Sequence, residues 1–175
     1  MRFGALLAGS VAPDAPLLLL TAGYYLYRRI TDATGPHGLY GPDYDRLFYY
    51  DPFWVFSHNI LHAPLIIIPL VLIGLYKWHA SHSPRGAALF WFSVGCAFHS
   101  VTDVFTHHAD GPLLLFPFNW NYRFVSPVSY WHPAFYGRIF GTLETATDLA
   151  IVTYLAISWL RRKRIVSVPK SVPAP

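Results

Sequence analysis

Four long apolar stretches dominate the chain and leave it few ways to fold. They cover residues 3–27, 60–76, 86–105 and 145–160. A helix crosses the hydrocarbon core of a bilayer in about 20 residues, with a range of about 17–25. Only 13% of the residues are charged, whereas soluble domains carry about 25%. The sequence predicts an all-α integral membrane bundle of about four transmembrane helices, with four buried helices of a soluble protein as the alternative.

Composition excludes several other classes of protein. A hydrophobic fraction of 54% excludes a disordered chain. The single cysteine, Cys96, excludes a disulfide scaffold and a zinc site built from thiolates. The net charge of +4 is small and clustered, so it gives no reason to expect a nucleic-acid partner. The partner that we expect is the lipid bilayer, and the sequence leaves the oligomeric state open.

The basic residues predict how the chain is oriented in the membrane. Residues 161–164 read Arg-Arg-Lys-Arg and directly follow the last apolar stretch. Such clusters stay in the cytoplasm, and four spans then place the N-terminus there too. We therefore expect a multi-pass protein of the bacterial inner membrane with both termini cytoplasmic. Residues 1–164 form the expected single membrane-embedded domain, and residues 165–175 the expected flexible cytoplasmic tail.

Two long connections, one after the first stretch and one after the third, are rich in aromatic residues and lie outside in this orientation. Tyr and Trp gather where a membrane meets water. We interpret these two outer loops as an interfacial belt, and a surface on which substrate stacks is the alternative.

Asp14 is the only charged residue inside the first apolar stretch. Pro13 and Pro16 flank it, and proline in a helix interior breaks or kinks the helix. Broken backbone at membrane depth is tolerated where it lines a polar cavity. The sequence therefore predicts a break that presents the Asp14 carboxylate to such a cavity.

Pairs of candidate metal ligands stand at the ends of two other stretches. His58 and His62 are four residues apart at the start of the second predicted helix, and His99 and Asp103 are four apart at the end of the third. His107 extends the second row by another four if the helix continues that far. Residues four apart share one face of a helix, so each pair can aim two ligand atoms at one point.

The predicted topology brings these groups to one level. All the acidic and imidazole groups in the predicted helices lie toward the outer side of the membrane. They are the two pairs, Asp14, and Glu144 with Asp148 at the start of the fourth predicted helix. Ionisable groups inside a membrane are costly and are functional by default. We therefore predict one metal site there, with a purely structural polar network as the alternative. Glu144 and Asp148 would support its ligands or bind a second metal, and a favourable charge at a helix start is the alternative for them.

The motifs around these residues resemble the YdjM-like membrane-bound metal-dependent hydrolases, relatives of bacterial zinc-dependent phospholipase C. The resemblance rests on Pro13-Asp14, the His58-x-x-x-His62 and His99-x-x-x-Asp103 pairs, and the run Gly-Pro-Leu-Leu-Leu-Phe-Pro at 111–117. Arg123 falls in the basic and aromatic segment that follows. The resemblance implies a metal-dependent hydrolase and leaves its substrate undefined.

The leading hypothesis is a hydrolase whose metal site lies at the outer membrane interface. The expected ligands of one or two divalent ions, zinc first and manganese or iron as alternatives, are Asp14, His58, His62, His99, Asp103 and His107. The ion would supply hydroxide near neutral pH. We count Asp103 among the catalytic residues because it can bind one ion or bridge two.

Other residues complete this hypothesis. Glu144 or Asp148 would serve as the base, and Arg123 would hold an anionic group such as phosphate. A phospholipid or another lipid-linked ester is the expected substrate. Two alternatives remain: a redox carrier that binds haem through histidines such as His62 and His99, and a non-catalytic protein whose metal only staples the helices together.

Overall fold

The computed structural model describes residues 2–31 and 40–166, with side chains described as far as residue 161. Within these ranges the chain is helical and contains no strand. Its elements are α1 (Phe3–Val11), α2 (Ala15–Ile30), α3 (Pro42–Tyr50), α4 (Pro52–Asn59), α5 (Pro64–Ala80), α6 (Pro84–Thr106), η1 (Pro133–Phe135) and α7 (Gly137–Val166). The chain divides into two compact units, Met1–Pro127 and Val128–Pro175, and each is described by itself. The predicted domain over residues 1–164 spans both.

The helices confirm an all-α protein with about four candidate membrane spans. In the part of the chain that the structure describes, Pro52–Ala80, Pro84–Thr106 and Gly137–Arg161 are long and apolar enough to cross a membrane. The helices α1 and α2 pass the same test together and are bent by 44° at the break between them. This is the break predicted at Asp14.

The second apolar stretch differs from the prediction in one respect that concerns the histidines. The helix α4 ends at Asn59, and a turn precedes α5 at Pro64. Ala63 is extended, with φ −70° and ψ 126°, because a residue that precedes proline avoids the helical region. His58 therefore ends one helix and His62 lies in the turn before the next. The prediction that both occupy one helix face is wrong.

The helix α6 matches the third stretch and ends at Thr106. Ser83 begins it by accepting a hydrogen bond from the Gly86 amide at 3.2 Å. His107 follows the helix with φ −117° and ψ 114°, so it does not extend the row of His99 and Asp103 by a further helical turn.

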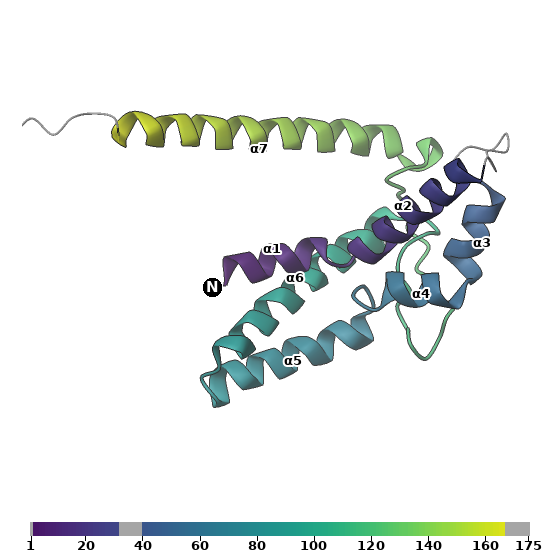
Figure 1. Cartoon of the computed structure of the whole chain (residues 1–175), viewed down its shortest axis with the longest axis horizontal. Coiled ribbons are helices and arrows are strands. Elements are labelled where there is room, and N and C mark those ends of the chain that lie inside the picture. The colour runs from purple at the N-terminus through teal and green to yellow at the C-terminus, as the bar shows by residue number, and fades with distance from the viewer. Residues whose placement is uncertain (1, 32–39, 167–175) are drawn as a thin grey trace, which may run out of the picture. The chain divides into compact units, whose positions relative to one another are not determined.

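Glycines allow three helices of the first unit to pack closely. Figure 1 shows α6 between α1 and α5, which both contact it. A Cβ on Gly9 would overlap the Phe92 carbonyl, and a Cβ on Gly95 would overlap the Leu6 carbonyl. Only glycine permits so close an approach of two backbones.

The two loops expected to be rich in aromatic residues differ from each other. The first contains α3 and α4, where Asp51 caps α4 by accepting hydrogen bonds from the amides of Phe53 at 3.0 Å and Trp54 at 3.1 Å. The second is irregular as far as η1 and contains one isolated bridge, between Leu113 and Arg123. Part of it closes the small core of the first unit, which consists of Val55, Ala63, Leu113 and Phe116, with Ile66 against them.

In the second unit, α7 begins at Gly137, eight residues before the apolar stretch 145–160. Glu144 and Asp148 are therefore the eighth and twelfth residues of α7 rather than residues of its first turn. The alternative of a favourable helix-start charge therefore does not apply to these two residues, because the first turn of α7 contains no acidic residue. The predicted tail, residues 165–175, lies outside the described residues except for the first two, which continue α7.

Candidate metal centre

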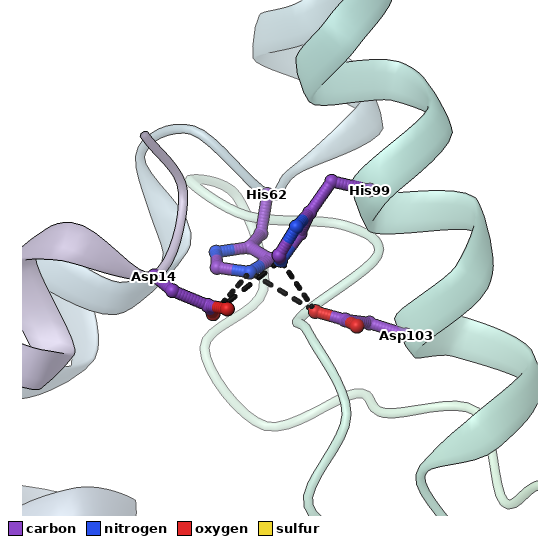
Figure 2. Close-up of side chains that lie close together, drawn as sticks. All are labelled: Asp14, His62, His99 and Asp103. Atoms are coloured by element: carbon purple, nitrogen blue, oxygen red, sulfur yellow. Dashed lines mark ion pairs between the residues drawn. The ribbon is translucent and has the colours of Figure 1, made fainter. Parts of the chain in front are cut away.

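Four predicted ligands converge at one end of the first unit. They are Asp14, His62, His99 and Asp103, and one ligand atom of each lies within 4.8 Å of the others. Figure 2 shows that they approach from three elements: Asp14 from the break between α1 and α2, His62 from the turn before α5, and the other two from α6. Residues far apart in the sequence thus meet at one point.

The separations of these atoms suit a small cation. The Nε2 of His62 lies 3.6 Å from Asp14 Oδ1 and 3.1 Å from Asp103 Oδ2. The Nε2 of His99 lies 3.3 Å and 3.1 Å from the same two oxygens. Tetrahedral zinc, with bonds of about 2.0–2.1 Å, needs ligand atoms about 3.3 Å apart. These imidazole–carboxylate distances scatter around that value.

Backbone carbonyls orient both imidazoles. The Nδ1 of His62 pairs with the His58 carbonyl at 2.5 Å, and the Nδ1 of His99 pairs with the Ser10 carbonyl at 2.9 Å. A carbonyl only accepts, so each Nδ1 must carry the proton and donate it. In a neutral ring this leaves a lone pair on Nε2, which is the arrangement typical of metal-binding histidines.

Among the described residues, the Nε2 atoms of His62 and His99 are buried and make no hydrogen bond. With Nδ1 protonated, both lone pairs face the oxygens of Asp14 and Asp103. Such an arrangement is repulsive unless a proton or a cation lies between the groups. A divalent cation satisfies both nitrogens and both carboxylates at once.

The four side chains differ in their access to the exterior. The exposed fraction of the side chain is 0% for His62, 14% for His99, 17% for Asp103 and 59% for Asp14. The Asp14 side is therefore open, and a water or substrate group can reach the centre from there. An open position distinguishes catalytic zinc sites from structural ones.

Close packing of α1 on α6 sets the geometry of His99. Gly95 lies one turn before His99, and Gly9 directly precedes Ser10. Because both glycines let the backbones touch, the Ser10 carbonyl reaches the His99 ring. This contact between residues 89 positions apart could not be read from local sequence.

Asn59 is a positioning residue that sequence analysis missed. It is fully buried; its Nδ2 donates to the Val55 carbonyl at 2.8 Å, and its Oδ1 accepts from the Leu113 amide at 2.7 Å. Its own carbonyl accepts from the His62 amide at 3.1 Å. Asn59 thus ties the run 111–117 to the turn that carries His62. In the sequence, the sign of this role was a single Asn side chain between two histidines of an apolar segment.

Two predicted ligands lie beside the group rather than in it. The His58 ring is buried, with its centroid 4.7 Å from that of His62 and 5.2 Å from that of Phe48. The Nδ1 of His107 lies 3.9 Å from Asp103 Oδ1. The structure therefore brings together four of the six predicted ligands.

The Arg123 side chain contacts two aromatic rings and a backbone carbonyl. It donates to the Gly111 carbonyl, and its guanidinium lies 5.5 Å from the centroid of the Phe48 ring and 5.4 Å from that of Tyr49. It forms no ion pair with any residue that the structure describes. Burial lowers the pKa of Arg123. Its positive charge is not neutralised by a contacting carboxylate.

Glu144 and Asp148 belong to the second unit. Glu144 accepts a hydrogen bond from the Tyr130 hydroxyl, which joins the segment before η1 to α7. Their expected role as the base remains a prediction.

A model of the zinc-dependent phospholipase C family matches residues 2–164. The chain belongs to that family. No curated protein and no solved structure matches it. Membership in the zinc-dependent phospholipase C family agrees with the donor set, since two imidazoles and two carboxylates are typical zinc ligands. Together they support a divalent metal, with zinc foremost. The haem alternative gave the carboxylates no role, yet both lie within 3.6 Å of the His62 nitrogen.

Proposed function

We propose that this protein is a membrane-bound, metal-dependent hydrolase of the YdjM-like type that cleaves a phospholipid or another lipid-linked ester. The proposal depends on the hydrogen bonding of two imidazole rings. The Nδ1 atoms of His62 and His99 are committed to backbone carbonyls, and their Nε2 atoms face two carboxylates without a hydrogen bond. Family membership over residues 2–164 supports the same chemistry.

Asp14, His62, His99 and Asp103 would hold the zinc. When bound, zinc is a Lewis acid that lowers the pKa of a coordinated water to about 7 and so supplies a nucleophile at neutral pH. The buried His62 and the half-buried Asp103 fix one side of the centre. The exposed Asp14 leaves the other side open to the ester, and His58 and His107 would support the ligands from outside.

Arg123 would bind the anionic part of the substrate. Its charge has no contacting carboxylate among the described residues, and Phe48 and Tyr49 hold its guanidinium. Arginine matches the oxygens of a phosphate through two parallel hydrogen bonds. A phosphoester is therefore the favoured substrate, with Glu144 or Asp148 as the candidate base.

The position of the centre favours a substrate that resides in the membrane. Asp103 lies three residues before the end of α6, which is a candidate span. A site at the end of a span lies at the depth of lipid headgroups. By the positive-inside rule this is the outer face of the bacterial inner membrane, with both termini cytoplasmic.

The test combines metal analysis with hydrolysis of mixed detergent–phospholipid micelles by the full chain. We expect bound zinc in the purified protein and release of a phosphorylated headgroup. His99→Ala should lose both, whereas His79→Ala, a histidine at the other end of the hairpin, should keep both. Full metal content in His99→Ala would contradict the assigned site. Bound metal without turnover of any phospholipid offered would leave a metal that only staples the helices.

A further inference from the structure

A second candidate site lies at the opposite end of the α5–α6 hairpin. A pocket of about 300 Å³ is bounded there by the start of α1 and the turn between α5 and α6. Its lining includes Arg2, Trp78, His82, Ser83 and Trp91. At about 1.5 Å per residue of helix, the 16 residues from Ala87 in the pocket to Asp103 span about 24 Å. The pocket is therefore separate from the metal centre.

This end of the first unit carries positive charge and no acid. The sequence contains no Asp or Glu before Asp14, and none between Asp51 and Asp103. Arg2 lines the pocket itself, and Lys77 and Arg85 lie near it on the last turn of α5 and the first turn of α6. An uncompensated positive field of this kind attracts anions.

One residue that lines the pocket, Trp91, has a hydrogen-bond donor without an acceptor among the described residues. The Nε1 of Trp91 is buried, and no residue that the structure describes accepts its proton. The indole N–H only donates, so an acceptor on a bound ligand could satisfy it. The ring centroid of Trp91 lies 6.3 Å from that of Trp78, which places two amphipathic rings around the same opening.

The turn itself adds one more polar group. His82 has a left-handed backbone with φ 47°, a conformation that costs energy for any residue with a Cβ. Glycine would adopt it more easily. A histidine nevertheless occupies this position, and its side chain lines the pocket.

We propose that this pocket binds a phosphate group, either on an anionic lipid headgroup or on a free phosphate compound. Arg2 would supply the charge, and the Trp91 N–H and His82 would donate hydrogen bonds. The volume is at the lower end of ligand pockets, about 300–1,000 Å³, which suits a headgroup and not a whole lipid. Phe3 and Leu7 of α1 are exposed and favour the lipid, because its acyl chains could lie along them.

The test measures ligands retained by the full chain in neutral detergent, using native mass spectrometry. The probes are phosphatidylglycerol, phosphatidylcholine and inorganic phosphate. We expect phosphatidylglycerol to bind at least about tenfold more tightly than phosphatidylcholine, whose choline cation meets the basic residues. Arg2→Gln should weaken this binding about tenfold, since it removes a charge-assisted bond. Arg85→Gln makes the same charge change outside the pocket and should alter it less than about twofold.

Two further variants protect the test from trivial failure. Trp91→Phe keeps a ring but removes the N–H, and His82→Gly removes the imidazole while easing the backbone. Both should weaken binding severalfold while bound zinc stays unchanged, which shows that the fold is intact. If inorganic phosphate displaces the bound phosphatidylglycerol, the ligand is a free phosphate compound. If it does not, the ligand is a lipid. Equal loss in Arg2→Gln and Arg85→Gln, or equal binding of both lipids without competition by inorganic phosphate, would overturn the proposal.

Discussion

The two ends of α6 present opposite chemistry on one helix. At the end near Thr106, two carboxylates and two imidazoles converge. At the end near Pro84, the surroundings contain arginine, histidine and tryptophan, and the sequence has no acid from residue 52 to residue 102. Buried nitrogens that make no hydrogen bond to a described residue occur at both ends, on His62 and His99 and on Trp91. The two imidazole nitrogens carry lone pairs and suit a bound cation, whereas the indole N–H carries a proton and suits a hydrogen-bond acceptor, which an anion can supply.

A membrane around α6, which is a candidate span, would sharpen this difference. A charged group at membrane depth is costly unless a partner offsets its charge. Among the described residues, the ion pairs of Asp103 are all with histidines, so a bound cation would stabilise this end further. The basic end lies at a helix terminus, where anionic headgroups are available. The predictions below test whether the two ends have the separate ligands assigned to them.

The largest effect is expected from Asp103→Asn. The amide keeps the size of the carboxylate but loses its charge and one ligand oxygen. We expect normal folding and a loss of zinc affinity beyond the factor of about 10–100 that follows loss of an outer partner. Metal stoichiometry and thermal unfolding of the same sample measure both. Asp43→Asn, which alters an exposed ion pair with Arg28, is the matched control. Unchanged zinc with lower stability would assign Asp103 a salt-bridge role instead.

The next prediction separates ligands from neighbours. His62→Ala should release most of the zinc, because its Nε2 faces both carboxylates. His58→Ala should release much less, because His58 supports the ring of His62 through a backbone carbonyl that the substitution keeps. Zinc titrations of the two variants under one buffer condition give the ratio. Equal losses would return His58 to the ligand set.

These two residues also show where sequence reasoning succeeds and fails. The pair His99 and Asp103 was placed correctly because its spacing lies within one regular helix. The pair His58 and His62 has the same spacing, but Pro64 ends the turn and forces Ala63 out of the helical region. That proline was visible in the sequence, and the general restriction before proline could have predicted the interruption.

Other parts of the centre were beyond local reasoning. Asp14 could be predicted as a break, because Pro13 and Pro16 flank it. Its approach to His99 depends on how α1 packs on α6, and that packing depends on Gly9 and Gly95. Tertiary contacts of this kind have no periodic sequence pattern. The start of α7 differs from the prediction for another reason, because its first turns mix apolar residues with two glycines, Arg138 and Glu144 and so fall outside the apolar stretch.

Gly95→Ala should produce an intermediate effect. The added methyl overlaps the Leu6 carbonyl, so α1 must move away from α6 and carry the Ser10 carbonyl from His99. Overpacking of this kind costs about 1–3 kcal/mol, and zinc affinity should fall with it. Gly23→Ala is the matched control, because no atom lies within 4 Å of its Cβ position. Thermal unfolding with and without zinc measures both effects. Wild-type affinity in Gly95→Ala would show that the contact does not position His99.

The smallest expected effect is that of chelation on the distant pocket. Removing zinc should destabilise the first unit by the binding free energy, about 4 kcal/mol if zinc stands at 1,000 times its Kd. Phosphatidylglycerol binding should nevertheless change less than about twofold, because the two sites share no residue and lie about 24 Å apart along α6. The measurement is native mass spectrometry of the same sample before chelation, after chelation and after zinc is restored. A large, reversible loss of lipid on chelation would mean that α6 couples its two ends and that the two sites are linked. A loss that zinc does not reverse would indicate unfolding, which near-ultraviolet circular dichroism on the same sample would detect.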